Sequence, residues 1–208
     1  MTDAPGLLVA RLLLDPEVAP PDARELGGGL VAVAAVLHDG RLTDAPGCSV
    51  DDALAGLRTL PTPEHQLAAH AVHAFEAADP LGASRLLVVE DLLAAVGEPD
   101  LPDDGRFGLL VAVPDARVLL VHAVRDEQVL RAAHLMATIA RMRQGEADAI
   151  GPHVYHRTAD GTLTQVTQHS DDEIEVHVDG SLADALAGLG LVDRSRKARR
   201  AAARRARG

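Results

Sequence analysis

Residues 107–124 read FGLLVAVPDARVLLVHAV, two apolar runs separated by the tetrapeptide Pro114-Asp115-Ala116-Arg117. Both runs are rich in valine and leucine, and a proline followed by an aspartate is typical of a turn. We therefore predict an antiparallel hairpin formed by residues 107–113 and 118–124. This hairpin decides the fold class, because it builds the second half of the chain around an antiparallel sheet.

The segment after this hairpin predicts a helix that packs on the sheet. Asp126 can cap its first turn, and the helical pattern continues to about Arg143. The apolar residues recur three and four positions apart, which places them on one helical face: Val129, Ala132, Ala133, Met136, Ile139 and Ala140.

The rest of the second half continues the antiparallel pattern. Residues 153–158 and 162–167 flank Ala159-Asp160-Gly161, which predicts a second hairpin with a glycine available for a left-handed turn. Residues 173–178 alternate charged and apolar side chains, as a half-exposed strand does. The pair Ser181-x-x-Asp184 predicts the N-cap of a last helix. Together these elements predict an α+β fold, an antiparallel sheet with packed helices.

One segment resembles a known family. The resemblance covers Gly105–Val166, where a strand ending in Val-Pro, a short turn, a second strand, a helix and a glycine-containing hairpin follow one another. The residues that carry it are Gly105, Val111-Ala112-Val113-Pro114, Val118-Leu119-Leu120-Val121, Ile150-x-Pro152 and Asp160-Gly161-x-Leu163. With these residues in this order, the segment is similar to the C-terminal part of the bacterial YtpQ-like family of uncharacterised proteins. The resemblance implies an α+β scaffold and carries no mechanism.

The first hundred residues predict a smaller α/β lobe. Leu7–Leu14 fits a strand or one buried helical turn, and its apolar pattern does not separate the two. Leu30–Leu37 predicts a buried strand that follows a glycine loop at Gly27-Gly28-Gly29. Ser49 followed by Asp52 is an acidic capping box, which predicts a helix ending near Leu60.

Two further elements are expected before residue 97. Thr62-Pro63-Glu64 places a proline in a first helical turn, which predicts a second helix reaching about Ala78. Residues 85–96 mix β-branched and helix-forming side chains, so we predict a strand running into a helical turn.

Three parts of the chain follow from these signals. Residues 97–105 are rich in proline, glycine and acids, which is typical of a linker. The sequence thus predicts an N-terminal lobe over 1–99, a C-terminal lobe over 105–192 and a basic tail over 193–208. The two lobes could also form one continuous domain.

Composition excludes several classes of function. Hydrophobic residues make up 47% of the 208 residues, enough for a packed core, whereas aromatic residues make up only 1%. So few rings disfavour sites built on aromatic stacking. The single cysteine, Cys48, excludes an internal disulfide and a multi-cysteine zinc site. No signal-like leader and no apolar run of about 20 residues occurs, so we expect a cytoplasmic protein without membrane association.

The net charge of −11 hides an asymmetry. Eight basic residues and no acid lie in the segment 194–207, which leaves 12 basic against 31 acidic residues elsewhere, a net charge of −19. Such a tail could bind phosphates, whereas the acidic body would repel them. It could equally form a disordered or helical tail that folds back on the body or aids solubility. The residues that would bind nucleic acid are Arg196, Lys197, Arg199, Arg200, Arg204, Arg205 and Arg207.

The ten histidines raise the question of a metal site. On the helix predicted after Pro63, His70 and His73 are three residues apart and could share a face with Glu76. Two such ligands would need a third from elsewhere to hold a metal. The alternative is that both are partly exposed helix residues. His153 and His156 lie on a predicted strand and point to opposite faces, so they cannot chelate together.

Signatures of an enzyme are missing from the sequence. There is no Gly-x-Ser-x-Gly, and Cys48 has no identifiable histidine partner. The glycines at 27–29 precede a strand, whereas a phosphate loop precedes a helix. No cofactor motif is present. We therefore expect a non-enzymatic binding or interaction module with a protein partner. The alternatives are a metal-dependent hydrolase using His70 and His73, and a nucleic-acid-associated protein using its tail.

Overall fold

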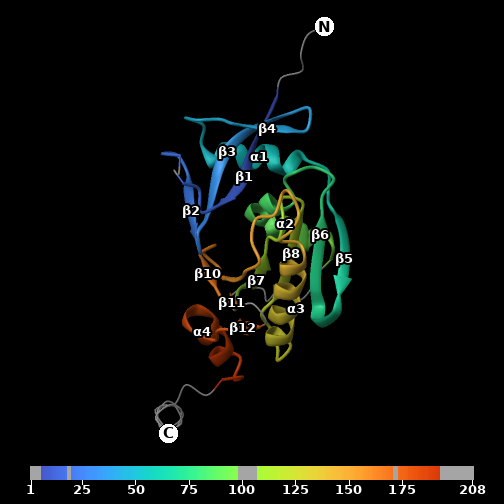
Figure 1. Ribbon diagram of the computed structural model, residues 1–208, viewed down its shortest axis with the longest axis vertical. Helices are drawn as coiled ribbons and strands as arrows, with labels where there is room; N and C mark the ends of the chain where they lie inside the picture. Colours follow the sequence, from blue (N-terminus) through green and yellow to red (C-terminus); the bar gives the residue numbers. More distant parts are fainter. Residues whose placement is uncertain (1–5, 18–19, 98–106, 171–172, 193–208) are drawn as a thin grey trace.

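The main body of the chain is built on a six-stranded antiparallel sheet. A computed structural model describes residues 6–17, 20–97, 107–170 and 173–192. The fold is α+β, as the sequence predicts. Figure 1 shows this sheet beside a long helix, with a second sheet above it. The strand order of the large sheet is β10 (Leu163–Gln165), β9 (Val154–Arg157), β7 (Leu109–Ala112), β8 (Val118–Ala123), β6 (Val72–Glu76) and β5 (Glu64–Ala68).

Both hairpins predicted in the second half are confirmed. β7 and β8 pair with Val111 opposite Val121, and β9 and β10 pair with His156 opposite Thr164. β11 (Thr167–His169) and β12 (Ile174–Val176) form a separate two-stranded sheet, which confirms the strand predicted over 173–178.

A second antiparallel sheet is formed by the N-terminal segment. β1 pairs with β3 along its whole length, so the alternative left open for Leu7–Leu14 is resolved as a strand. β3 also pairs with β2 near its beginning and with β4 near its end. The bounds are β1 (Leu7–Leu14), β2 (Arg24–Gly27), β3 (Leu30–His38) and β4 (Arg41–Asp44).

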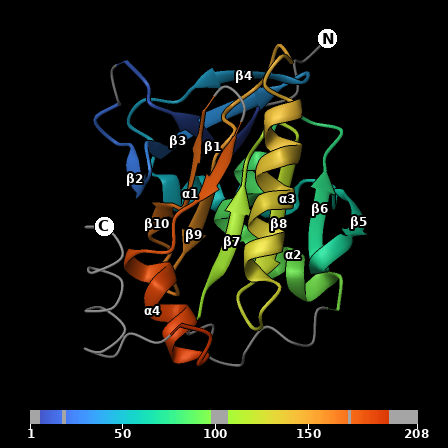
Figure 2. The same ribbon diagram turned by 60° about the horizontal axis from the view of Figure 1, so that its bottom comes forward.

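Each face of the large sheet has its own apolar core. On one face lies α3 (Val129–Met142), whose predicted apolar side is buried apart from the partly exposed Ile139. Asp126 accepts a hydrogen bond from the Gln128 backbone N–H just before this helix. Figure 2 shows α3 in front of β7 and β8. The other face packs against β1, β3, α1 (Val50–Thr59) and α2 (Val89–Ala95). In α1, Ser49 accepts from the Asp51 N–H, so the predicted cap is confirmed.

The helix predicted from Pro63 to Ala78 is wrong. These residues form the hairpin β5–β6, joined by a tight turn, η1 (Ala69–Ala71), in which His70 and Ala71 have left-handed φ angles. Val72 and Phe75 are both fully buried but belong to the two different cores, one on each face of the sheet. On a helix they would lie on the same side. Pairing of β6 with β8, more than 40 residues further along the chain, overrides the local helical signal.

Two smaller predictions are also wrong. Residues 85–96 contain no strand: a 3-10 helix, η2 (Ala83–Val88), runs into α2. A buried apolar run without alternation is compatible with a strand or a helix. Here the run is helical and packs in the apolar core on one face of the large sheet. The last helix, α4 (Gly180–Gly188), has Asp179 at its N-cap without a side-chain hydrogen bond. The Ser181 hydroxyl does not cap it, because it lies 2.8 Å from His156 Nδ1.

The large sheet joins residues from both predicted lobes, because β5 and β6 precede residue 98 and the other four strands follow residue 106. Residues 98–106, which hold most of the predicted linker, and the tail 193–208 lie outside the described residues. In the parts that are described, no helix has the length and apolarity needed to cross a bilayer.

The two sheets differ in whether the outer side of an edge strand is covered by other residues. β1 is an edge strand whose outer side is covered: the Leu12 N–H donates to Ser84 Oγ, and α1 crosses closely over the Leu8 carbonyl at Gly56. β5 is an edge strand with no described strand on its other side. Figure 1 shows it at the outer margin of the sheet.

Candidate functional site

The residues proposed as metal ligands are not brought together. His70 lies in the hairpin turn with a left-handed φ of 57°, and His73 is buried on β6. Glu76 is three residues further along the same strand, so it points to the opposite face from His73. No group of three potential ligands that could hold a metal ion exists among the described residues. The error follows directly from the wrong helix, because only a helix places residues three apart side by side.

His73 instead contacts His65 on the neighbouring strand. His65 Nε2 and His73 Nδ1 are 3.0 Å apart, and the two rings stack at a centroid distance of 5.2 Å. The ring of Phe75 is 5.0 Å from that of His65. These three rings lie on the same face of the large sheet and connect its edge strand, β5, to β6.

Two other buried histidines contact groups of distant segments through their ring nitrogens. His156 Nε2 lies 2.9 Å from the Phe107 carbonyl oxygen, and its Nδ1 lies 2.8 Å from Ser181 Oγ in α4. His122 Nδ1 lies 3.2 Å from the Ala71 carbonyl oxygen. Burial lowers the pKa of both imidazoles. Both rings contact main-chain or hydroxyl groups of distant segments.

These two histidines should make stability depend on pH. Because their pKa values are lower in the folded state, the unfolded chain takes up protons that the folded protein does not. Stability is then complete above the unfolded value of about 6.5 and falls as the pH decreases below it, by up to about 1.4 kcal/mol per pH unit for each histidine. Urea unfolding at pH 7.5, 6.5 and 5.5 measures the slope. The variant His122→Gln/His156→Gln should reduce the slope without abolishing it, because burial also lowers the pKa of His153 and of His169.

The matched control for this pH dependence is His134→Gln, which removes an exposed imidazole of α3. Its slope should equal that of the wild type. An equal slope in the double variant would contradict the assignment of His122 and His156 as the source.

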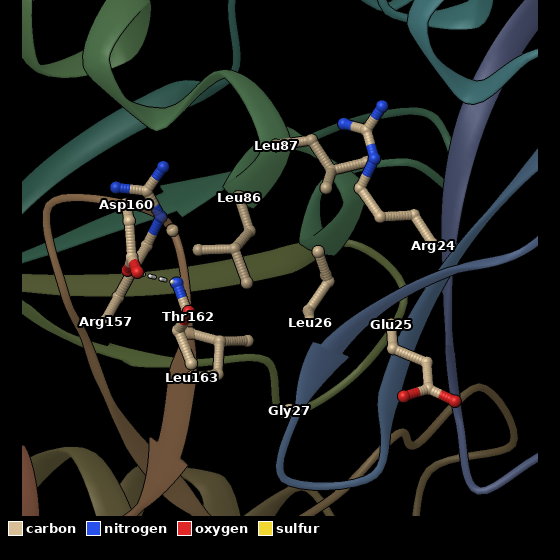
Figure 3. A pocket seen from close by; sticks show the side chains of 11 residues that line it. Arg24, Glu25, Leu26, Gly27, Leu86, Leu87, Arg157, Asp160, Thr162 and Leu163 are labelled. Carbon is tan, nitrogen blue, oxygen red and sulfur yellow. Dashed lines mark hydrogen bonds between the residues drawn. The ribbon is translucent and has the colours of Figure 1, made fainter.

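A cleft lies where the edges of the two sheets meet. It has a volume of about 390 Å³ and is bounded by β2, η2 and the β9–β10 hairpin. Figure 3 shows Arg157 and Arg24 on either side of Leu86 and Leu87. The glycine loop predicted at 27–29 forms part of its wall: a Cβ on Gly27 would overlap the Leu163 carbonyl, and one on Gly28 would overlap the Tyr155 ring. The glycines therefore let this loop approach β9 and β10 closely.

A larger groove begins at the end of β5 where Glu64 pairs with Glu76. Its volume is about 800 Å³, and it runs between the segment leading into β5 and the segment leaving β6. Its apolar wall is formed by Leu37, Leu60, Pro61, Pro63, Ala77, Ala78 and Pro80, and its charged residues are Glu64, Glu76, Asp79 and Arg117.

A buried ion pair fixes one wall of this groove. Arg85 donates to both carboxylate oxygens of Asp79, at 2.9 and 2.8 Å, and also to the Pro61 carbonyl oxygen at 2.8 Å. Burial by itself raises the pKa of Asp79, but the hydrogen bond and charge of Arg85 outweigh it and the net pKa is lowered. The arginine thus ties the proline-rich segment before β5 to the segment after β6.

The charges along β5 are unevenly balanced. Glu64 stands directly opposite Glu76 in the β5–β6 register. Glu76 lies 3.6 Å from Arg143, whereas Glu64 has no cationic partner among the described residues. Like charges at opposite positions of a strand pair destabilise it. A cation supplied from outside the sheet at Glu64 would relieve this repulsion.

Cys48 is a free, partly buried thiol beside the start of α1 and packs against the apolar core. The basic residues of the tail, from Arg194 to Arg207, lie outside the described residues, so nucleic-acid binding through them stays a prediction. Neither the cleft nor the β5 edge carries a sequence signature, because each is assembled from segments distant in sequence.

Comparison with protein-family models, with curated proteins and with solved structures gives no match to this chain.

Proposed function

We propose that this protein is a non-enzymatic binding module that takes an extended, basic segment of a partner protein as an additional strand along β5. The observation that carries the proposal is the open outer side of β5. Four of its five residues are exposed, including Leu67, of which 64% is accessible. Unpaired N–H and C=O groups on an exposed strand are a template for another strand.

The groove beside β5 supports the same function. A segment added along β5 would extend past Glu64 into the groove lined by Pro61, Pro63 and Ala78. Main-chain hydrogen bonds along the strand would supply affinity, and the apolar wall would select side chains. This combination suits an extended polypeptide better than a compact small molecule.

The charges favour a basic partner. Glu64 lacks a cationic partner among the described side chains and faces the like charge of Glu76. Outside the tail the chain carries a net charge of −19, which attracts cationic segments and repels acidic ones. A lysine or arginine opposite Glu64 is therefore expected in a bound segment.

A display selection tests the proposal with a defined probe. Random linear peptides of about ten residues are long enough to cover β5 and the groove at about 3.4 Å per residue. Selection on the full-length protein should enrich peptides with alternating apolar residues and at least one lysine or arginine. Their affinity should fall about tenfold or more in Leu67→Lys, because a charged side chain on an edge strand blocks strand addition.

The matched control is Leu130→Lys, the same substitution at an exposed leucine of α3. It should leave peptide affinity unchanged, whereas Glu64→Gln should weaken binding severalfold at low salt and less at high salt. Selected peptides that bind Leu67→Lys as tightly as the wild type would contradict the proposal, as would a selection without enrichment.

A further inference from the structure

We propose that the cleft between β2 and the β9–β10 hairpin is a second binding site, which takes a small organic carboxylate with an apolar body. The two sites lie at opposite edges of the large sheet, because β5 is one edge strand and β10 is the other. The proposal is therefore independent of the function proposed for β5.

The shape and lining of the cleft suit a small ligand. Its volume of about 390 Å³ is within the range of small-molecule sites. Leucines at 26, 86, 87 and 163 supply an apolar floor from three different segments. In Figure 3 Leu86 and Leu163 point into the space between the two arginines. Such a floor would bury the hydrocarbon part of a ligand.

Arg157 is the group that would hold the carboxylate. Its side chain is only 15% exposed, yet it makes a single ion pair, from Nη1 to Glu90 Oε1 at 2.7 Å. Its Nη2 makes no hydrogen bond to any described residue and lies 3.8 Å from where a Cβ on Gly161 would be, on the wall of the cleft. A guanidinium binds a carboxylate best with two parallel N–H groups, and Glu90 uses only one.

The acidic residues of the cleft do not occupy Arg157. Asp160 accepts hydrogen bonds from the Thr158 hydroxyl and the Thr162 N–H within its own turn. The Glu25 carboxylate lies on the far side of the cleft from Arg157 (Figure 3). Glu90 is 59% exposed, so a ligand carboxylate could replace it at the guanidinium while Glu90 turns to water. Arg24, held by Asp51, adds a second positive charge at the rim.

The test uses three six-carbon probes that differ only in the end group: hexanoate, hexan-1-ol and hexylamine. Each is titrated into the ¹⁵N-labelled full-length protein while amide chemical shifts are followed. Hexanoate should shift the amides of Gly27, Gly161 and Leu163 in a saturable way. Hexanol should bind at least about tenfold more weakly, and hexylamine should leave these amides unchanged, because neither offers a carboxylate to Arg157.

Three variants separate binding from a structural role of the ion pair. Arg157→Gln should weaken hexanoate binding about tenfold or more. Arg58→Gln, which removes another arginine paired with an acid of α2 but outside the cleft, should not change it. Glu90→Gln should tighten binding severalfold, because it removes the carboxylate that competes for Arg157. A purely structural pair would make both Arg157→Gln and Glu90→Gln neutral or harmful.

Several outcomes would overturn the inference. They are the absence of saturable shifts with hexanoate, equal binding of hexanol, or equal binding by Arg157→Gln and Arg58→Gln. If Arg157→Gln does not fold, as its amide spectrum would show, Glu90→Gln decides: weaker or unchanged hexanoate binding in that variant contradicts the site.

Discussion

Replacing Gly56 with alanine should destabilise the protein by about 3 kcal/mol, although alanine is the better helix former by about 1 kcal/mol. Gly56 lies inside α1, where the helix crosses β1, and an added Cβ would overlap the Leu8 carbonyl oxygen. That oxygen is a main-chain atom of β1 on the side that faces α1, so the overlap cannot be relieved by turning a side chain. Equilibrium unfolding in urea measures the loss.

The control for this prediction is Gly145→Ala. Gly145 has nothing within 4 Å of an added Cβ and has no left-handed φ. Its replacement should be neutral or stabilising by a few tenths of a kcal/mol, because alanine restricts the unfolded chain. If both variants had the same stability, the close approach of α1 to β1 would be refuted.

Replacing Arg85 with methionine should cost about 3 kcal/mol. The substitution keeps the apolar stem but leaves Asp79 and the Pro61 carbonyl without their donor. Removing one partner of a buried ion pair typically costs 3–5 kcal/mol, and the lower end applies because 21% of the Asp79 side chain is exposed. The wall of the groove should loosen as well, so affinity for a selected peptide should fall in the fraction that remains folded.

The comparison for Arg85→Met is Arg58→Met. Arg58 pairs with Asp91 at 2.9 Å, but more than half of each side chain is exposed. Exposed ion pairs contribute about 0–1 kcal/mol, so this variant should lie within about 1 kcal/mol of the wild type. If both arginine variants lost the same free energy of unfolding, burial would not be the reason that the Arg85–Asp79 pair stabilises the protein.

The sequence predicts those elements whose signals are local. The hairpin at 107–124 and the apolar face of α3 are confirmed because turn residues and helical spacing act over a few positions. The prediction for the segment from Pro63 to Ala78 fails because its structure depends on a distant strand: pairing with β8 places β6 within the large sheet, between the two apolar cores. A capping proline cannot outweigh that contact.

The candidate sites depend even more on contacts between residues that are distant in sequence. No local spacing reveals that β5 is left at an edge of the large sheet. The cleft depends on Arg157 meeting a wall formed by residues 24–27, a contact that no sequence spacing indicates. Predictions confined to the basic tail stay open, because the tail lies outside the described residues.

The most direct test of the binding function is amide hydrogen exchange of β5 with and without a saturating amount of a selected peptide. Strand addition should slow exchange of the outward-facing amides of residues 64–68 by about tenfold or more, because each would gain a main-chain acceptor. The amides of α3 should not change. Protection that arises in another segment, with β5 exchanging at its free rate, would contradict the proposal that β5 is the binding edge.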